Sequence, residues 1–485
     1  MQTYSVPLII RGLIIENQEI SFSGRRDGVS FQGPSVEKYL SKLTEQSPSR
    51  LYDLYQISFT EILDYLAELG RRLTLGQNPF LQEALALSIR TSGMTESLLR
   101  GCYQALPYFF GRSIVHDTVE HTIGIDSVER WVEREAEGGG RVAVRAFGAR
   151  AVHIVAGNAP GISALTIVRN AVTRSDAIIK TPSNDPLTAV AIGRTMIDMA
   201  PEHPLTRHLS VAYWKGGDAA IEAKLYQPRN IEKIIAWGGM GSISHITKYI
   251  QPGIDLITLD PKLSSTIIGK QAFIDAATMR FVAERLALDI GVFNQEACLN
   301  ARVVYIESGT DDAGLATANA FGALLYEAIQ ALPEHLSTPA KAIESGLAEE
   351  LSSLALNSDW HKIYGGDGSG AVIVSQIDEP VDFADSLTNR VANIVPIDDL
   401  TVAVKAVTSY TQTIGIYPDS LKKELRDRLS LHGAQRLVSL GCASEPVLGA
   451  PQDGVETLRR MCKWIVDESR DIKQLRTYDK IPASA

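Results

Sequence analysis

From about residue 141 onward, apolar segments of strand length alternate with helical segments, and this alternation constrains the fold more than any other feature. The strand-like segments are residues 151–156, 176–180, 209–213, 232–237 and 254–259. The helical segments between them are residues 161–172, 186–199, 217–226 and 242–250. Strands separated by helices form βαβ units, so the pattern predicts a parallel sheet with helices on both faces.

The same alternation resumes in a second unit. Its predicted elements are helices at 271–288, 312–331 and 338–354 and strands near 301–306 and 371–375. The chain ahead of residue 140 differs, because residues 48–121 show the apolar spacing of helices. VPLIIRGLII and EISFSG, which precede that region, predict a short N-terminal hairpin.

The C-terminal segment DGVETLRRMCKWIVDE, 453–468, carries an acidic start and an apolar stripe, which predict a helix. We therefore expect three parts in the chain. They are an N-terminal hairpin and helical region 1–140, a first α/β domain 141–265 completed by the C-terminal helix within 451–485, and a second α/β domain 266–450.

Charge and cysteine usage exclude several classes of protein. The chain has 47 Lys and Arg against 57 Asp and Glu, a balance that argues against nucleic-acid binding but leaves room for a basic pocket for one nucleotide. The cysteines at 102, 298, 442 and 462 form no CxxC pair, which indicates free thiols in a reducing compartment and no zinc site. No signal peptide is recognisable, and His153, Asn158 and Pro160 interrupt the most apolar window, so we expect a cytoplasmic protein without a membrane span.

Cys298 is the first candidate for chemistry. It lies in GVFNQEACLNARVVYIE, 291–307, in a polar loop just before a predicted strand, where a thiol can be accessible enough to act as a nucleophile. A lone cysteine is more often a small buried apolar residue. Cys102, Cys442 and Cys462 fit that simpler description.

Two polar side chains end neighbouring strands of the first sheet. Asn158 follows the strand in VAGNAPG, and Lys180 ends the next strand, at the edge where open α/β sheets bind ligands. Taken singly, Asn158 is typical of a turn and Lys180 of a solvated strand end. None of the nine histidines forms a pair at metal-ligand spacing, so no metal is expected.

A glycine-rich turn follows the fourth strand in AWGGMGSISH, 236–245. Gly238, Gly239, Gly241 and Ser242 would let a phosphate approach the N-terminus of the next helix. The spacing is not the dinucleotide fingerprint GxGxxG, and a tight packing turn explains it equally well.

Together, these three stretches resemble the aldehyde dehydrogenase superfamily in order and separation. The chain is also similar to the LuxC-type acyl-CoA reductases through VPLIIRG, GNAPGISALTIVRNAVTRSDAIIKTPSNDP, FNQEACLNARVVYIE, GSGAVIVS, LTNRVANIVPID and LHGAQRLVSLG. The resemblance implies a Rossmann-type cofactor domain and an α/β catalytic domain. It also implies that Cys298 is the nucleophile, Asn158 an oxyanion donor and Lys180 a ligand of the cofactor ribose, with the glycine turn and Ser242 beside the pyrophosphate.

The sequence departs from an oxidising aldehyde dehydrogenase in its acidic residues. The superfamily's water-activating Glu is missing from ITLDPKLSS, 257–265, where Asp260 is the nearest acid, and Asp385 stands where a second family Glu is expected. Without that base an acyl-cysteine would persist until hydride reaches it, which favours reduction of a fatty acyl thioester to the aldehyde. An oxidising dehydrogenase using Asp260 and a non-catalytic acyl carrier remain as alternatives.

The cofactor and the partners are expected from the same comparison. The family's NAD-selecting Glu lies three residues after the Lys, and here that position is Ser183, so NADPH is expected unless Asp185 repels its 2′-phosphate. The resemblance implies an acyl-CoA or acyl-protein donor, an acyl-protein synthetase or acyltransferase partner, and a homo-oligomer. Aromatic residues at 108–110 and 131 could line an acyl channel, although core packing is their commoner use.

Overall fold

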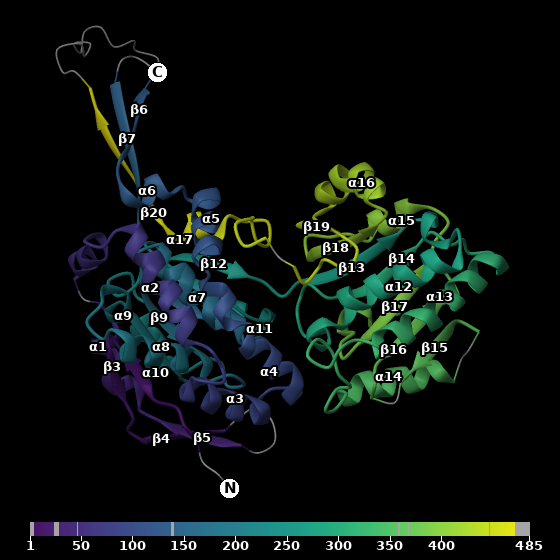
Figure 1. Ribbon diagram of the computed structural model, residues 1–485, viewed down its shortest axis with the longest axis horizontal. Coiled ribbons are helices and arrows are strands. Elements are labelled where there is room, and N and C mark those ends of the chain that lie inside the picture. The colour runs from purple at the N-terminus through teal and green to yellow at the C-terminus, as the bar shows by residue number, and fades with distance from the viewer. Residues whose placement is uncertain are drawn as a thin grey trace.

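The computed structural model describes residues 4–23, 29–45, 47–136, 140–356, 359–366, 368–445 and 447–470. These residues form two lobes, each built on a seven-stranded sheet, with a narrow three-stranded sheet projecting from the first lobe (Figure 1). The chain crosses between the lobes twice, once after residue 259 and again after residue 439.

The sheet of the first lobe confirms the predicted parallel arrangement. Its order is β12-β11-β8-β9-β10-β2-β3, and the strands from β8 to β12 are parallel. These are β8 (Arg150–Ile154), β9 (Asp176–Lys180), β10 (Leu209–Ala212), β11 (Lys233–Trp237) and β12 (Asp255–Leu259). The connecting helices are α7 (Gly161–Val172), α8 (Thr188–Met199), α9 (Pro204–Arg207), α10 (Ala219–Leu225) and α11 (Met240–Thr247).

Successive side chains of these strands enter two different cores, which is why the strands are apolar on both faces. Ile179 of β9 packs in the core shared with α7 and α8, whereas Ile178 packs in the core shared with α10 and α11. A strand places neighbouring side chains on opposite faces. Uninterrupted apolar runs therefore mark a sheet covered by helices on both sides.

The N-terminal hairpin differs in detail from the prediction. VPLIIRGLII alone forms the hairpin of β2 (Leu8–Ile10) and β3 (Leu13–Ile15), which joins the first sheet through antiparallel pairing with β10. Arg11 and Gly12 have φ values of 50° and 85° at its tip, as a type I′ turn requires. β4 (Ile20–Ser23), from EISFSG, pairs instead with β5 (Ser30–Gly33), which also pairs with β1 (Tyr4–Ser5).

The expected N-terminal helices are present, and all but α1 share a core with α7 and α8. They are α1 (Val36–Leu43), η1 (Pro48–Tyr55), α2 (Phe59–Arg72), α3 (Pro79–Thr91), α4 (Glu96–Gln104), η2 (Leu106–Phe110), α5 (Arg112–Thr122) and α6 (Ile125–Glu129). Among them α1 packs on the opposite face of the sheet, beside α10. Within the described residues, no helix combines the length and apolar composition needed to cross a bilayer.

The second lobe is also a helix-covered, largely parallel sheet, ordered β15-β16-β17-β14-β13-β18-β19. Its strands are β13 (Leu263–Ile268), β14 (Ala301–Ile306), β15 (His361–Gly365), β16 (Ala371–Ser375), β17 (Val391–Pro396), β18 (Thr411–Tyr417) and β19 (Arg436–Ser439). Its helical elements are η3 (Lys270–Phe273), α12 (Ala276–Gly291), η4 (Val292–Gln295), α13 (Asp312–Gln330), α14 (Ser345–Ala355), η5 (Ala384–Ser386), α15 (Leu400–Lys405) and α16 (Asp419–His432).

The predicted C-terminal helix at 453–468 is wrong. Only α17 (Thr457–Met461) is helical there, and β20 (Lys463–Ser469) follows as a strand. β20 pairs antiparallel with β7 (Gly140–Phe147), which also pairs with β6 (Val132–Ala136). Tertiary pairing overrides the helical spacing because KWIV, with its aromatic and β-branched residues, suits a strand. The remainder of the expected segment, 471–485, lies outside the described residues.

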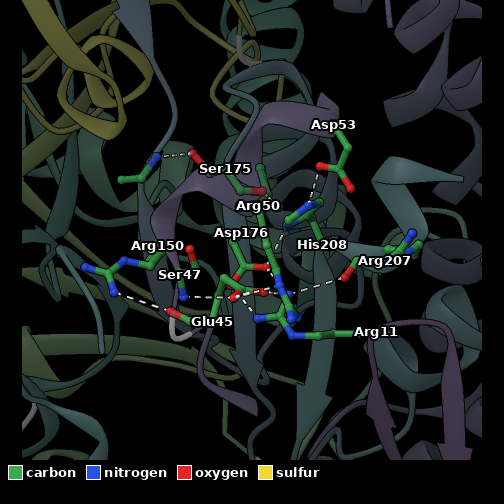
Figure 2. A network of polar contacts seen from close by, with 12 residues as sticks. Arg11, Glu45, Ser47, Arg50, Asp53, Arg150, Ser175, Asp176, Arg207 and His208 are labelled. Atoms are coloured by element: carbon green, nitrogen blue, oxygen red, sulfur yellow. Dashed lines mark hydrogen bonds and ion pairs between the residues drawn. The ribbon is translucent and has the colours of Figure 1, made fainter. Parts of the chain in front are cut away.

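A polar network around Asp176 fastens the N-terminal region to the amino end of β9 (Figure 2). Arg11 donates to both carboxylate oxygens of Asp176, at 2.6 and 2.8 Å. His208 lies between Asp176 and Asp53, at 2.9 and 2.7 Å. Burial opposes protonation of His208, but the two carboxylates outweigh it and raise the pKa of this imidazole above its ordinary value.

His208→Gln should lower the thermal unfolding midpoint at pH 6 by a few degrees, and the deficit should shrink as the pH rises towards 9. A group whose pKa is raised by folding adds stability below its unfolded value, about 6.5, and loses it as the pH rises through the folded value. Calorimetry of both proteins across this range tests the effect, with the exposed His432→Gln as control. A deficit independent of pH would show that His208 acts through packing alone.

Candidate active site

The loop that carries Cys298 has an unusual backbone. It connects α12 to β14, and Phe293, Asn294 and Gln295 have φ values of 58°, 52° and 64°. Three consecutive non-glycine residues in the left-handed region are unfavourable, so the surrounding structure must hold them there. Such strain is typical of functional sites.

Amide side chains of the loop supply that support. The Asn294 Oδ1 atom accepts from the backbone of Thr338 at 2.8 Å. The Gln295 side chain donates to the carbonyls of Ala301 and Val391, each at 2.8 Å, and accepts from the N–H of Val391. Asn300 ties the other end of the loop to the end of α12. The polar residues of FNQEACLN therefore fix the position of the cysteine.

Cys298 is partly exposed and contacts polar groups from other strands of the second sheet. Ser264 of β13 donates to its carbonyl at 2.7 Å, and the Gln412 Nε2 atom of β18 lies 3.2 Å from its Sγ atom. Burial and the nearby Asp453 carboxylate raise the pKa of the Cys298 thiol, while Gln412 and Arg302 oppose that rise.

Asn158 lies in the turn between β8 and α7 and reaches across to the loop that carries Cys298. Its Nδ2 atom donates to the carbonyl of Glu296, two residues before Cys298, at 3.2 Å. Its Oδ1 atom is buried without a hydrogen-bond partner among the described residues. The structure thus brings together the two residues that the sequence assigned to catalysis.

Lys180 lies at the carboxyl end of β9, as expected, but it is not a solvated strand end. Its Nζ atom lies 5.5 Å from the ring centre of Trp214, and burial lowers the pKa of Lys180 to about 8, partly offset by Glu222. Ser183 is partly buried in the turn that follows. This end of the sheet can hold a polar ligand beside an aromatic face.

The glycine turn leaves open space where a tight packing turn would not. Cβ atoms built on Gly239 or Gly241 would meet nothing within 4 Å, whereas one on Gly238 would lie 3.0 Å from the Cβ atom of Ser242. Gly239 is the N-cap residue of α11. The turn therefore fits a bound phosphate group at the start of that helix.

Acidic residues near the two predicted sites have different roles from those expected. Asp185 is buried and accepts from Thr188 at the start of α8, so it is engaged within the fold. Glu222, which sequence reasoning missed, is a buried carboxylate that accepts from Trp214, Gly217 and His245 at 3.2, 3.2 and 2.6 Å.

The Oδ2 atom of Asp260 lies 3.8 Å from the Nζ atom of Lys262. The carboxylate that raises the pKa of the Cys298 thiol is that of Asp453. Sequence reasoning missed both Gln412 and Asp453. The only signal was the Asp-Gly pair in PQDGV, which predicts a turn but not what lies beside it.

This two-lobed arrangement is the aldehyde dehydrogenase fold. The chain superposes on aldehyde dehydrogenase 21 from Physcomitrella patens with a TM-score of 0.74 at 14% identity, covering 98% of this chain and 99% of that one. It matches an NADP-dependent glyceraldehyde-3-phosphate dehydrogenase from Bacillus halodurans, solved with NADP, with a TM-score of 0.71 at 13% identity, covering 96% and 99%. At these identities the likeness shows the fold alone.

Sequence comparison gives the family. Residues 54–464 match the family described as acyl-CoA reductase (LuxC), and the chain belongs to it. A long-chain acyl-protein thioester reductase of Aliivibrio fischeri is 26% identical over 470 residues, 96% of this chain and 93% of that protein. Another, from Photorhabdus luminescens, is 28% identical over 366 residues, 73% of this chain and 70% of that protein.

Proposed function

We propose that this protein reduces a long-chain fatty acyl thioester to the aldehyde with NADPH, through an acyl group carried on Cys298. The meeting of Asn158 with the Cys298 loop, beside a β12–β13 connection that contains no Glu, is the observation that carries the proposal. Family membership and the names of the relatives support the acyl-thioester substrate. Acyl-CoA and an acyl protein remain the two candidate donors.

The chain's own residues perform acyl transfer. The Cys298 thiolate attacks the thioester carbonyl, and the donor thiol leaves with the proton that Cys298 gave up. The Asn158 amide donates to the developing oxyanion, in a role worth about 3 kcal/mol. A bound nicotinamide nucleotide supplies hydride to the acyl carbon. The resulting hemithioacetal oxyanion on Cys298 collapses to the aldehyde as its C–S bond breaks, and the released thiolate takes up a proton from solvent.

NADPH is the proposed cofactor because no carboxylate stands three residues after Lys180. Ser183 occupies the position of the usual NAD-selecting acid, and Asp185 is engaged at the start of α8. Glu222 is nearer to Lys180, but three donors occupy its oxygens. Lys180 and the glycine turn would hold the nucleotide. We further propose a cytoplasmic homo-oligomer supplied by an acyl-protein synthetase or acyltransferase. Its proposed domain bounds are 1–140, 141–265 and 266–450, with strand β20 in place of the expected C-terminal helix.

A small apolar pocket lies beside α7 and, with room for about one water molecule, is too small for a fatty chain. Its lining includes Phe109, Ile114, Val115, Leu165, Val168 and Leu448. Of the aromatic residues expected to line a channel, Phe109 lines this pocket, Phe110 is buried in the core, and Tyr108 and Trp131 are 60% and 37% exposed. Arg169 also lines this pocket and donates to Gln452. Gln452 is the residue before Asp453, whose carboxylate raises the pKa of the Cys298 thiol.

A burst experiment tests the proposed reaction. Mixing the protein with acyl-CoA alone should release about one CoA per site and then nearly stop, because neutral water attacks a thioester slowly without a base. Adding NADPH should discharge the stored acyl group as aldehyde. Continuous hydrolysis at a rate comparable with reduction would contradict the proposal. Oxidation of aldehyde without acyl transfer, or a burst that NADPH cannot discharge, would indicate the dehydrogenase or the acyl carrier instead.

A further inference from the structure

Gln412 connects the Cys298 thiol to a carboxylate from a distant part of the chain. Its Nε2 atom lies 3.2 Å from Cys298 Sγ and 2.6 Å from Asp453 Oδ1. A primary amide nitrogen carries two hydrogens, so it can donate to both atoms at once. The Gln412 side chain is buried, which limits competition from water for these bonds.

Asp453 is held in place by a tight turn. Gln452 and Val455 exchange backbone hydrogen bonds of 2.9 and 3.0 Å around Asp453 and Gly454, whose φ values are 52° and 76°. Positive φ at both central residues is the type I′ geometry, which favours Asp-Gly. Arg169 of α7 fastens this turn to the first lobe by donating to Gln452 at 2.7 Å. The carboxylate is therefore presented from the first lobe to the second.

An amide can face the sulfur with its N–H or with its carbonyl oxygen, and the two have opposite effects. An N–H donor stabilises the thiolate, whereas a carbonyl stabilises the protonated thiol. An ionised carboxylate only accepts, so Asp453 selects the N–H side of Gln412. We propose that Asp453 orients Gln412 so that its N–H group stabilises the Cys298 thiolate, both as attacking group and as leaving group.

In this scheme Gln412 is a catalytic residue and Asp453 a positioning residue, and the scheme rests on Cys298 being the nucleophile of the proposed function. Several groups act on the carboxyl of Asp453. Burial and Asp260 raise its pKa, whereas the hydrogen bond from Gln412 and the charges of Lys262 and Arg169 lower it. Because the charge of Asp453 itself disfavours a thiolate, any benefit of Asp453 must come through Gln412.

Alkylation of Cys298 by iodoacetamide between pH 6 and 10, followed by peptide mass mapping, measures the thiolate directly. Gln412→Met keeps the length of the side chain and removes the donor. It should raise the apparent pKa of Cys298 by about one unit and slow alkylation at pH 7.5 about tenfold. Gln376→Met, which alters a glutamine hydrogen-bonded to Asn319 in the same lobe, should change neither. Gln412→Ala replaces Gln412→Met if that variant does not fold by circular dichroism. An unchanged profile overturns the proposal.

A double-mutant cycle tests whether Asp453 acts through Gln412. Asp453→Asn should slow alkylation about threefold or more in the wild-type background, despite the lost negative charge, because its amide no longer fixes Gln412. In the Gln412→Met background the same change should slow nothing. Unchanged or faster alkylation of Asp453→Asn alone, or equal slowing in both backgrounds, overturns the proposal. Alkylation needs neither acyl donor nor nucleotide, so it tests this proposal alone. Failure of the proposed function would appear instead as absent aldehyde formation in the burst experiment.

Discussion

Replacing Cys298 with alanine should leave no acyl-enzyme and no aldehyde formation above the uncatalysed background. The reaction requires a thiol in the loop that carries Cys298, and no second cysteine lies in that loop among the described residues. Burial raises the pKa of Cys102 and of Cys462 to about 12, so neither forms a useful amount of thiolate at neutral pH. Incubation with radiolabelled acyl-CoA, followed by denaturation, measures the acyl-enzyme.

The other three cysteines provide matched controls. Alanine at 102, 442 or 462 should keep acylation of the folded protein within about twofold of the wild type. The change should cost stability at most, since Cys102 and Cys462 pack in the core of the first lobe. Cys442 contacts Arg285 from the turn that follows β19 and is not part of the loop that carries Cys298. Label retained by denatured Cys298→Ala would show that the nucleophile has been assigned wrongly.

Asn158→Ala should lower the rates of acylation and of reduction by about a hundredfold. The lost amide donor acts on the oxyanion, which exists only in the tetrahedral steps, so the affinity for NADPH should change little. Stopped-flow measurement of CoA release and fluorescence titration with NADPH separate these effects. A comparable loss of NADPH affinity would assign Asn158 to the cofactor or to the turn.

Asn184→Ala is the matched control for Asn158. Asn184 donates to the carbonyl of Gly157 at 3.0 Å and so supports the same turn from its other side. Its loss should cost much less activity, because no donor near the reacting carbonyl is removed. Iodoacetamide should also alkylate Cys298 in Asn158→Ala at close to the wild-type rate, which would show that the loop carrying Cys298 is intact.

Much of the fold could be predicted from the sequence because local signals and tertiary structure agree. The bounds of β9 and of α7 coincide with the prediction, since Gly and Pro residues and a change of period mark their ends. β20 could not be predicted, because its partner β7 is far away in the chain and no local pattern reveals that pairing. The true helix, α17, accounts for only part of the apolar spacing there.

The candidate site could be predicted only where a motif carries it. Cys298, Asn158 and Lys180 stand in recognisable stretches, and the structure brings the first two to one place. Gln412 and Asp453 belong to no motif. The proximity of Gln412 to the thiol depends on the position of β18 in the second sheet, and that of Asp453 depends on how the lobes meet. The left-handed backbone at Phe293 was also hidden, since nothing in a non-glycine residue announces positive φ.

The second crossing between the lobes has a consequence for how the protein is made. Leu458, Met461 and Cys462 complete the core of the first lobe, although the whole second lobe precedes them in the chain. On the ribosome, the first lobe therefore waits with part of its apolar core uncovered while the second lobe is synthesised. Exposed apolar surface of this kind favours association between nascent chains. Premature termination after about residue 445 and before residue 457 would release a finished second lobe attached to an unfinished first one.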